Sequence, residues 1–364
     1  MSVIAVVVLI FSLLGAVDFL LGNKLGLGRE FEKGFSIFVP MVMSMLGVLV
    51  LAPAIGVWLT PVFNGFYEVF GIDPSILPAS LLANDMGGTV LALQVARDST
   101  VGAFSAFVVA SMLGSVISFG IPFALGVVKK HQHKELFFGL LCGIVTIPVG
   151  CFVAGLVCGV GVGALLLTLL PVIILSVLLC VLLIFFTNAC IKAFFVFGNG
   201  IRAVSIVGLV LGIFTFLTKI EVYEHFDSFE NAAMVCVNAC VTLSGALPLM
   251  YVLVKLLNKP LGRVGRRIGI DALATVSLLT ILATSSPVFG VMEKMNKKGV
   301  VLNAAFAVSA SYTFGSHLAY TMAVDGTYVL PMIVGKVISG VCAVLLALVL
   351  YKDRSEDQVP LAAD

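Results

Sequence analysis

The chain has 364 residues, of which 60% are apolar and only 11% are charged, and its formal net charge is +2. Soluble globular chains are about 45–50% apolar and about 25% charged. The composition therefore excludes a soluble protein and predicts a polytopic membrane protein surrounded by lipid. No basic patch in the sequence is large enough to suggest nucleic acid as a partner.

The residue types that enzymes and metal sites use are sparse. The chain has four histidines, and none of its eight cysteines forms a CxxC pair. The cysteines all lie in or beside apolar segments, where a thiol usually packs as a small apolar side chain. No nucleophile–base arrangement is visible, so we expect a protein that is not an enzyme, has no metal site and needs no cofactor.

Nine apolar runs of roughly 20 residues or more predict membrane-spanning helices. In chain order they are Val3–Leu21, Phe35–Leu59, Thr100–Val128, Leu136–Val160, Ala164–Phe186, Ala203–Ile220, Ala232–Leu257, Val300–Met322 and Val329–Leu350. No Lys or Arg precedes the first run. It therefore lacks the basic start of a signal peptide, and we expect it to be a true span.

Two further apolar segments are broken at a polar centre. Ile76–Ala96 breaks at Ala83–Gly88, and Leu273–Met295 breaks at Ala283–Pro287. Each arm is too short to cross, because at ~1.5 Å per residue it reaches only about halfway through a ~30 Å apolar core. Polar tips with Gly or Pro are typical of transporters, which place unwound backbone near mid-bilayer. We therefore expect an all-α fold with two re-entrant helical hairpins.

The distribution of Lys and Arg predicts the orientation through the positive-inside rule. If both hairpins turn back and the N-terminus lies outside, only Arg97, Lys219 and the intramembrane Lys336 are not cytoplasmic, which leaves 18 of 21 inside. If both segments cross instead, 10 lie on each side. The asymmetric arrangement predicts a multi-pass protein with its N-terminus outside and its C-terminus in the cytoplasm.

Short matches recur in the same order in the two halves of the chain, at an offset of about 200 residues. The pairs are Phe31-Glu32 with Phe229-Glu230, Gly71-Ile72-Asp73 with Gly269-Ile270-Asp271, Leu82-Ala83 with Leu282-Ala283, and Gly114-Ser115 with Gly315-Ser316. Because the predicted topology reverses each matched segment, it indicates an inverted repeat. The repeats are residues 1–160 and 201–351, with a linking span and cytoplasmic connector at 161–200 and a cytoplasmic tail at 352–364. Inverted repeats place the substrate site at their interface.

The first tip carries Asp85, with Asn84, Gly87 and Gly88 around it. A charge at mid-membrane is costly unless it has a ligand or a pathway to serve. We expect Asp85 to bind a substrate ammonium, while Asn84 and backbone carbonyls freed by the two glycines take its other donors. Alternatively, Asp85 is an ordinary N-cap of the half-helix that follows it.

The second tip offers three hydroxyls, those of Thr284, Ser285 and Ser286, before Pro287. They could hydrogen-bond a substrate hydroxyl or hold an ion, or they could cap a broken helix locally. His317 lies in the predicted span Val300–Met322 and could bind the same hydroxyl or move protons. An interhelical histidine with its partners satisfied is the alternative.

Three further residues are candidates for gating or coupling. Thr146 and Pro148 interrupt the fourth predicted span, where a proline frees a carbonyl and kinks a helix; a purely structural kink is the alternative. Lys336 lies in the last span and could pair with Asp85 or Asp325 when the site is empty. It could instead extend its ammonium to the membrane surface.

Four strings of this sequence resemble the bacterial ethanolamine permease family, EutH. They are Leu81–Gly88 (LLANDMGG), Gly143–Cys151 (GIVTIPVGC), Phe306–Ala310 (FAVSA) and Pro331–Lys336 (PMIVGK). The resemblance covers roughly Glu30 to Leu350 and implies uptake of ethanolamine across the bacterial cytoplasmic membrane.

The chain departs from that family's pattern at the second tip, where Asn-Asn-x-Pro is replaced by Thr284-Ser285-Ser286-Pro287. His317 stands where relatives can carry an acidic residue.

These observations predict a transporter that works by alternating access. Asp85 would bind the ammonium of ethanolamine, and Thr284, Ser285 and His317 would orient its hydroxyl. A channel-like facilitator is one alternative. Another is an ion-coupled transporter of a different small metabolite, such as an anion held by half-helix N-termini and Lys336. Coupling to Na⁺ or H⁺ stays open, and a homodimer is suggested only by analogy with other two-hairpin transporters.

Overall fold

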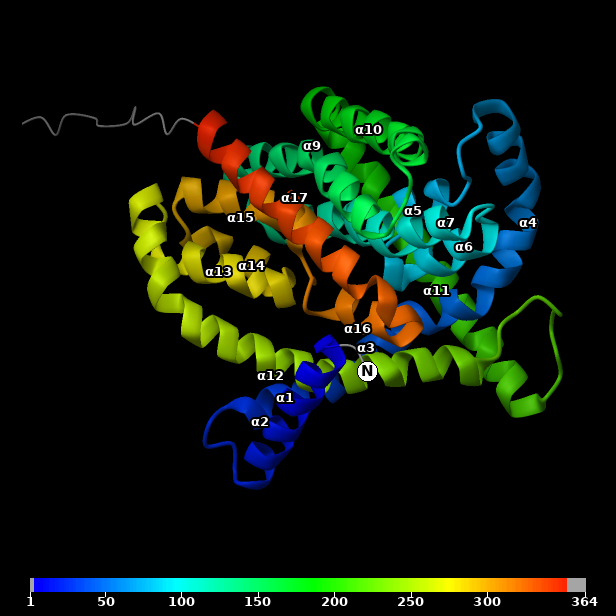
Figure 1. Cartoon of the computed structure of the whole chain (residues 1–364), viewed down its shortest axis with the longest axis horizontal. Coiled ribbons are helices and arrows are strands. Elements are labelled where there is room, and N and C mark those ends of the chain that lie inside the picture. The colour runs from blue at the N-terminus through cyan, green and yellow to red at the C-terminus, as the bar shows by residue number, and fades with distance from the viewer. Residues whose placement is uncertain (1–2, 352–364) are drawn as a thin grey trace, which may run out of the picture.

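The computed structural model describes residues 3–351, and over that range every regular element is helical (Figure 1). The predicted all-α class is confirmed. The predicted tail at 352–364 lies outside the described residues. Eight stretches of the described chain are helical, long and apolar enough to cross a membrane. They confirm a multi-pass membrane protein, although no bilayer is part of the structure.

One group of helices, which we call the frame, is built around the longest helix. It comprises α1 (Val3–Leu20), α2 (Leu27–Ser36), α3 (Phe38–Met41), a π-helical turn (Val42–Leu46), α4 (Gly47–Phe70), α11 (Thr187–Thr218) and α12 (Phe229–Ile268). Helices α1 and α2 pack on α12, while α4 packs on α11. Figure 1 shows α12 running beneath most of the other helices, while α1 and α2 lie below it.

The second group, which we call the hairpin body, contains both broken segments. It comprises α5 (Ile76–Leu81), α6 (Gly88–Val95), α7 (Ser99–Phe104), α8 (Ile121–Val127), α9 (His133–Val157), α10 (Val162–Phe185), α13 (Ala272–Ala283), α14 (Ser286–Val291), α15 (Lys297–Ala310), α16 (Ser316–Asp325) and α17 (Val329–Leu350). Helices α9, α15 and α17 pack on one another at its centre. Two π-helical stretches, Ser105–Gly114 and Val116–Gly120, join α7 to α8.

Both predicted helix breaks are present. In the first hairpin α5 ends at extended Leu82, and Gly87 adopts a left-handed φ of 93° before α6 begins. In the second, Thr284 is extended between α13 and α14. The two arms of each hairpin contact each other. Their re-entrance into a bilayer stays a prediction.

The prediction that Val300–Met322 forms one continuous span is wrong. The helix stops at Ala310 and resumes at Ser316, and Tyr312 between them has a left-handed φ of 61°. The reason is competition for hydrogen bonds. The Tyr312 N–H donates to the Ile281 carbonyl at 3.1 Å and the Phe314 N–H donates to the Leu282 carbonyl at 2.7 Å. The tip of the second hairpin thus replaces the acceptors that an unbroken helix would supply.

The predicted interruption at Pro148 is also wrong, because α9 continues through it. A proline removes one hydrogen bond, and membrane helices tolerate this loss when neighbouring helices pack against them. The Thr146 hydroxyl lies within hydrogen-bonding distance of the Gly143 carbonyl, at 2.9 Å, and of the Ser339 carbonyl of α17, at 3.2 Å. Thr146 therefore joins α9 to α17.

An aspartate closes the base of the first hairpin. One carboxylate oxygen of Asp73 accepts from the backbone N–H groups of Arg97 and Asp98, both at 2.9 Å, and the other accepts from Ser75 at 3.0 Å. Asp73 thus ties the start of the first arm to the end of the second.

The second hairpin has the same closure. One oxygen of Asp271 accepts from the Asn296 N–H at 2.7 Å and the other from the Ala274 N–H at 2.8 Å. Each aspartate follows a left-handed glycine, Gly71 or Gly269, that ends a long helix of the frame. Such parallels are what an internal repeat would produce, and they support the predicted one. Its inversion across a membrane stays a prediction.

Replacing Asp73 with Ala should lower the melting temperature of the purified protein, because three backbone N–H groups lose their acceptor. A buried donor without a partner costs about 1–3 kcal/mol. Thermal unfolding in detergent measures the shift. Glu68→Ala is the matched control, because Glu68 is an exposed carboxylate on α4. Melting temperatures equal to wild type for both variants would contradict the clamp.

Candidate functional site

A cavity of about 570 Å³ lies between the frame and the hairpin body. The hairpin body supplies most of its polar wall. The residues are Asp85, Ser115, Thr280, Thr284, Ser286, Tyr312, Ser316 and His317. The frame contributes a mainly apolar wall that includes Met41, Met45, Leu243 and Leu247. Its polar members are Glu30, Lys33, Ser44 and Tyr251.

The structure brings four predicted site residues, Asp85, Thr284, Ser286 and His317, to this one cavity. Other predicted residues do not line it. They are Asn84, Gly87, Gly88, Ser285, Thr146, Pro148 and Lys336. Residues from both hairpin tips therefore meet, as the sequence predicted. Which of them touch a substrate stays a prediction.

Asp85 sits in the short 3₁₀ turn Asn84–Met86 at the first tip. The cap position of α6 is Gly87, and no side chain caps that helix. The alternative that Asp85 is an ordinary N-cap is therefore wrong. Its half-buried carboxylate lies within hydrogen-bonding reach of the Ser316 side chain and interacts electrostatically with Lys336. An ionised carboxylate so placed is a strong acceptor for an ammonium group.

Asn84, Gly87 and Gly88 shape the tip and do not line the cavity. Asn84 is fully buried, and neither its amide nitrogen nor its amide oxygen has a hydrogen-bond partner within the described chain. Gly87 needs its left-handed backbone. A Cβ at Gly88 would collide with the Leu82 carbonyl. The two glycines therefore let the tip turn back tightly.

The second tip presents hydroxyls around an aromatic ring. The Ser286 hydroxyl lies 2.8 Å from the Tyr312 hydroxyl, and Thr284 also faces the cavity. Ser285 is only 2% exposed and borders a much smaller adjoining pocket. The ring centroids of Tyr312 and His317 lie 5.4 Å apart. Tyr312 thus connects the hydroxyls of the tip to His317.

Sequence reasoning missed Ser115, Tyr312 and Ser316 as residues of the cavity wall. A signal was present, because the repeat aligns Gly114-Ser115 with Gly315-Ser316. A Cβ at Gly114 would collide with the Leu82 carbonyl, and one at Gly315 with the Ala283 carbonyl. Each glycine lets a hairpin tip pack closely, which brings the following serine to the cavity.

Lys336 on α17 lies behind His317. Its Nζ donates to the Ser111 carbonyl at 2.6 Å and lies 3.1 Å from His317 Nδ1. The side chain is 1% exposed, so the alternative that it extends to the membrane surface is wrong. The expected alternative partner, Asp325, instead accepts from the Thr327 N–H at 2.9 Å.

Comparison with known proteins assigns this architecture to a family. Residues 1–350 match the family described as "Ethanolamine utilisation protein, EutH". The chain belongs to the EutH family. A relative from Listeria monocytogenes, named probable ethanolamine permease EutH, is 36% identical over 98% of this chain and 97% of its own. The protein of the same name from Salmonella typhimurium is 32% identical over 100% and 98%.

A further relative from Bacillus subtilis is the uncharacterized protein YxeR, which is 35% identical over 93% of this chain and 91% of its own. No solved structure matches the chain. The EutH match includes both hairpins and every residue of the cavity wall.

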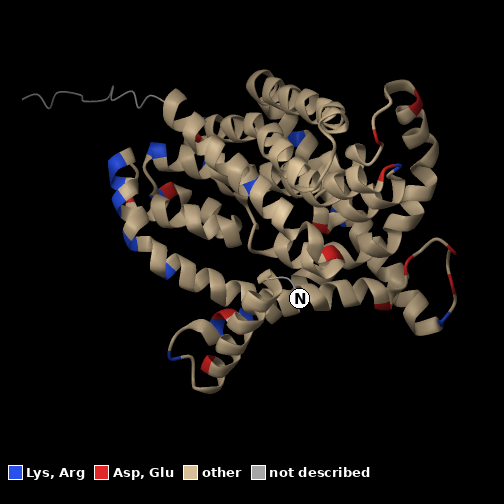
Figure 2. Cartoon of the chain, viewed as in Figure 1, with Lys and Arg blue, Asp and Glu red and all other residues tan. Residues whose placement is uncertain are grey.

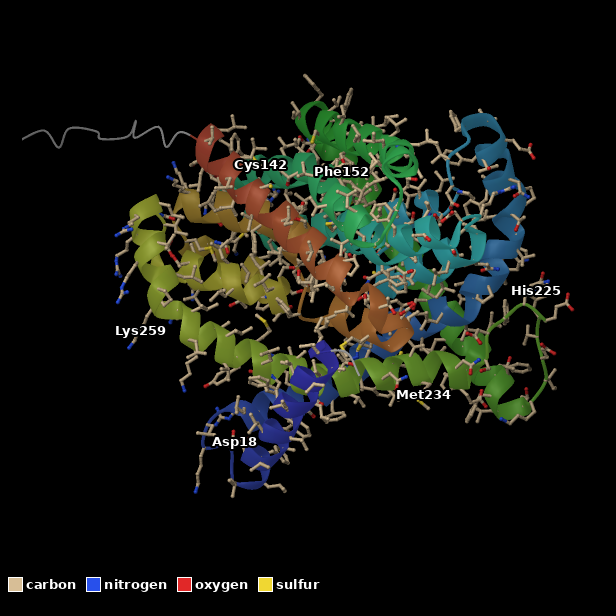
Figure 3. The ribbon with its side chains drawn as sticks, viewed as in Figure 1. Asp18, Cys142, Phe152, His225, Met234 and Lys259 are labelled. Atoms are coloured by element: carbon tan, nitrogen blue, oxygen red, sulfur yellow. The ribbon has the colours of Figure 1, made fainter. Side chains whose placement is uncertain are left out.

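The cavity reaches the surface at the basic end of this EutH family member. Lys33, whose side chain is 53% exposed, lines it beside Tyr251. Figure 2 shows Lys and Arg residues gathered at the C-terminal end of α12 and acidic residues on the loop at its other end. Figure 3 labels Lys259 in the basic part of α12 and His225 on the acidic loop at the opposite side of the molecule. The positive-inside rule would place the mouth in the cytoplasm.

Cysteine labelling tests this placement. Tyr251→Cys should react with a membrane-impermeant maleimide added to the cytoplasmic side, because Tyr251 lines the open cavity. Glu221→Cys, on the acidic loop, should react only from the opposite side. The partly exposed Cys158, Cys180 and Cys342 are first replaced by Ala. Labelling of both positions from one side would contradict the orientation.

Proposed function

We propose that this protein carries ethanolamine into the bacterial cytoplasm by alternating access. The observation that carries the proposal is a carboxylate and several hydroxyls, from two hairpin tips, on one wall of a single cavity. The names of the Listeria and Salmonella relatives support ethanolamine as the substrate.

Ethanolamine is an ammonium and a hydroxyl joined by two carbons, so it needs one anionic and one neutral polar partner. The Asp85 carboxylate would hold the ammonium in place of its present Ser316 contact. Thr284, Ser286 and His317 would bind the hydroxyl. A cation inside an apolar body is costly without such partners. This pairing is what would distinguish the substrate from uncharged small molecules.

The division of the cavity wall supports a moving carrier. The groups proposed to hold the substrate all belong to the hairpin body, whereas the facing wall of the frame is mainly apolar. Substrate bound to one body can travel with it, while the opposite surface, although it includes Glu30, Ser44 and Tyr251, is mostly apolar. The cavity is also far larger than ethanolamine, so the site must close before the substrate is sealed from water. A channel, by contrast, would need polar groups along a continuous path.

Asp85→Asn should reduce uptake of labelled ethanolamine at mildly acid pH by at least about tenfold. The amide carries no negative charge, so it cannot form an ion pair with the ammonium. Asp325→Asn is the matched control, since Asp325 is a carboxylate of α16 that does not line the cavity. Uptake is normalised to the amount of protein in the membrane. Wild-type rates in Asp85→Asn would refute the assigned role.

Exchange in proteoliposomes separates a carrier from a channel. Unlabelled ethanolamine inside the vesicles should accelerate entry of the labelled compound, because a loaded carrier returns with bound substrate. Entry should also saturate at low substrate concentration. A linear, unaccelerated flux would favour a channel-like facilitator. Repeating the measurement with and without a Na⁺ gradient tests whether transport is coupled to that ion.

A further inference from the structure

The hydrogen bonds of Lys336 have a consequence for the substrate. No carboxylate forms an ion pair with this buried lysine within residues 3–351. Its Nζ is held instead by the Ser111 carbonyl at 2.6 Å and by His317 Nδ1 at 3.1 Å. The Lys336 side chain therefore contacts two groups that carry no negative charge, and one of them, the His317 ring, belongs to the cavity wall.

The Ser111 carbonyl that contacts Lys336 belongs to an irregular part of the backbone. Ser111 lies in the π-helical stretch Ser105–Gly114. Such stretches are rare in proteins overall, and those that occur are often found at functional sites. The contact between Lys336 Nζ and the Ser111 carbonyl, at 2.6 Å, is at the short end of N–H···O hydrogen bonds. If Lys336 is an ammonium, it has three donors and no acceptor, so it donates to both the Ser111 carbonyl and His317 Nδ1.

The state of the histidine follows from this donor. Because an ammonium cannot accept a hydrogen bond, Nδ1 of His317 would accept the one from a charged Lys336. The ring proton would then lie on Nε2, which is 3.5 Å from the Ser115 hydroxyl. That contact is long, so the Nε2–H group keeps its capacity to donate to another acceptor in the cavity.

We propose that Lys336 is a positioning residue that fixes His317 as a hydrogen-bond donor, so that the site selects amines with a nearby acceptor oxygen. The proposal rests on the proposed function, because it assumes that amines bind at Asp85. The substrate oxygen would accept from His317 Nε2–H, and its own proton would go to Thr284 or Ser286. Ethanolamine satisfies this requirement, whereas ethylamine, which lacks the oxygen, would leave the Nε2–H group without its partner.

Nitrogen NMR of the wild-type protein labelled on histidine tests the tautomer directly. The chain has four histidines, and His317→Gln identifies the resonances of His317 by their loss. We expect the proton on Nε2 and none on Nδ1. A proton on Nδ1 would overturn the proposal, whether or not ethanolamine is the substrate.

Binding selectivity tests the consequence. The ratio of the dissociation constants of ethylamine and ethanolamine should fall by about tenfold in Lys336→Met, which corresponds to one hydrogen bond of about 1.4 kcal/mol. The ratio cancels the change in electrostatic attraction that both ammonium ions experience. Ser339→Ala, another buried position on α17, is the matched control and should keep the wild-type ratio.

The outcomes of the two experiments are separable. Equal weakening of both amines in Lys336→Met, with an unchanged ratio, would show a merely structural lysine and overturn the proposal. If the wild-type protein binds neither amine, the proposed function fails, while the NMR result still decides whether Lys336 sets the tautomer of His317.

Discussion

An ionisable group inside a membrane protein has to find its partners within the protein. Two such groups, Asp85 and Lys336, lie in the same hairpin body and interact electrostatically. Each also depends on an interrupted helix. Asp85 reaches the side chain of Ser316, at the start of the resumed helix α16, and Lys336 reaches a carbonyl of a π-helical stretch. The irregular backbone of this body is therefore the condition for its charged site.

The interruptions also hold one another in place. The break between α15 and α16 donates two backbone N–H groups to carbonyls at the end of α13. Glycines at equivalent places of the two halves let the backbone pack closely against a hairpin tip, Gly114 against the first and Gly315 against the second. The polar groups of the tips are thus positioned by backbone contacts inside one body. This arrangement supports a site that can move as a unit against the frame.

The sequence predicted the fold class, both hairpin breaks and four residues that share the cavity, because apolar length and polar interruptions are local signals. It failed where the outcome depended on a distant segment. Val300–Met322 is apolar enough for a span, yet carbonyls of α13 draw its backbone out of the helix. Pro148 is a local helix breaker, yet α9 continues beside α17. The wall residues Ser115 and Tyr312 depend on the same tertiary contacts.

An experimental structure of the protein with ethanolamine tests the central claim most directly. The account predicts the ammonium nitrogen within hydrogen-bonding distance of Asp85 and the hydroxyl oxygen near His317 and Ser286. It also predicts that the frame supplies only apolar contacts to the bound molecule. An ethanolamine held by the frame, or bound away from Asp85, would contradict the account.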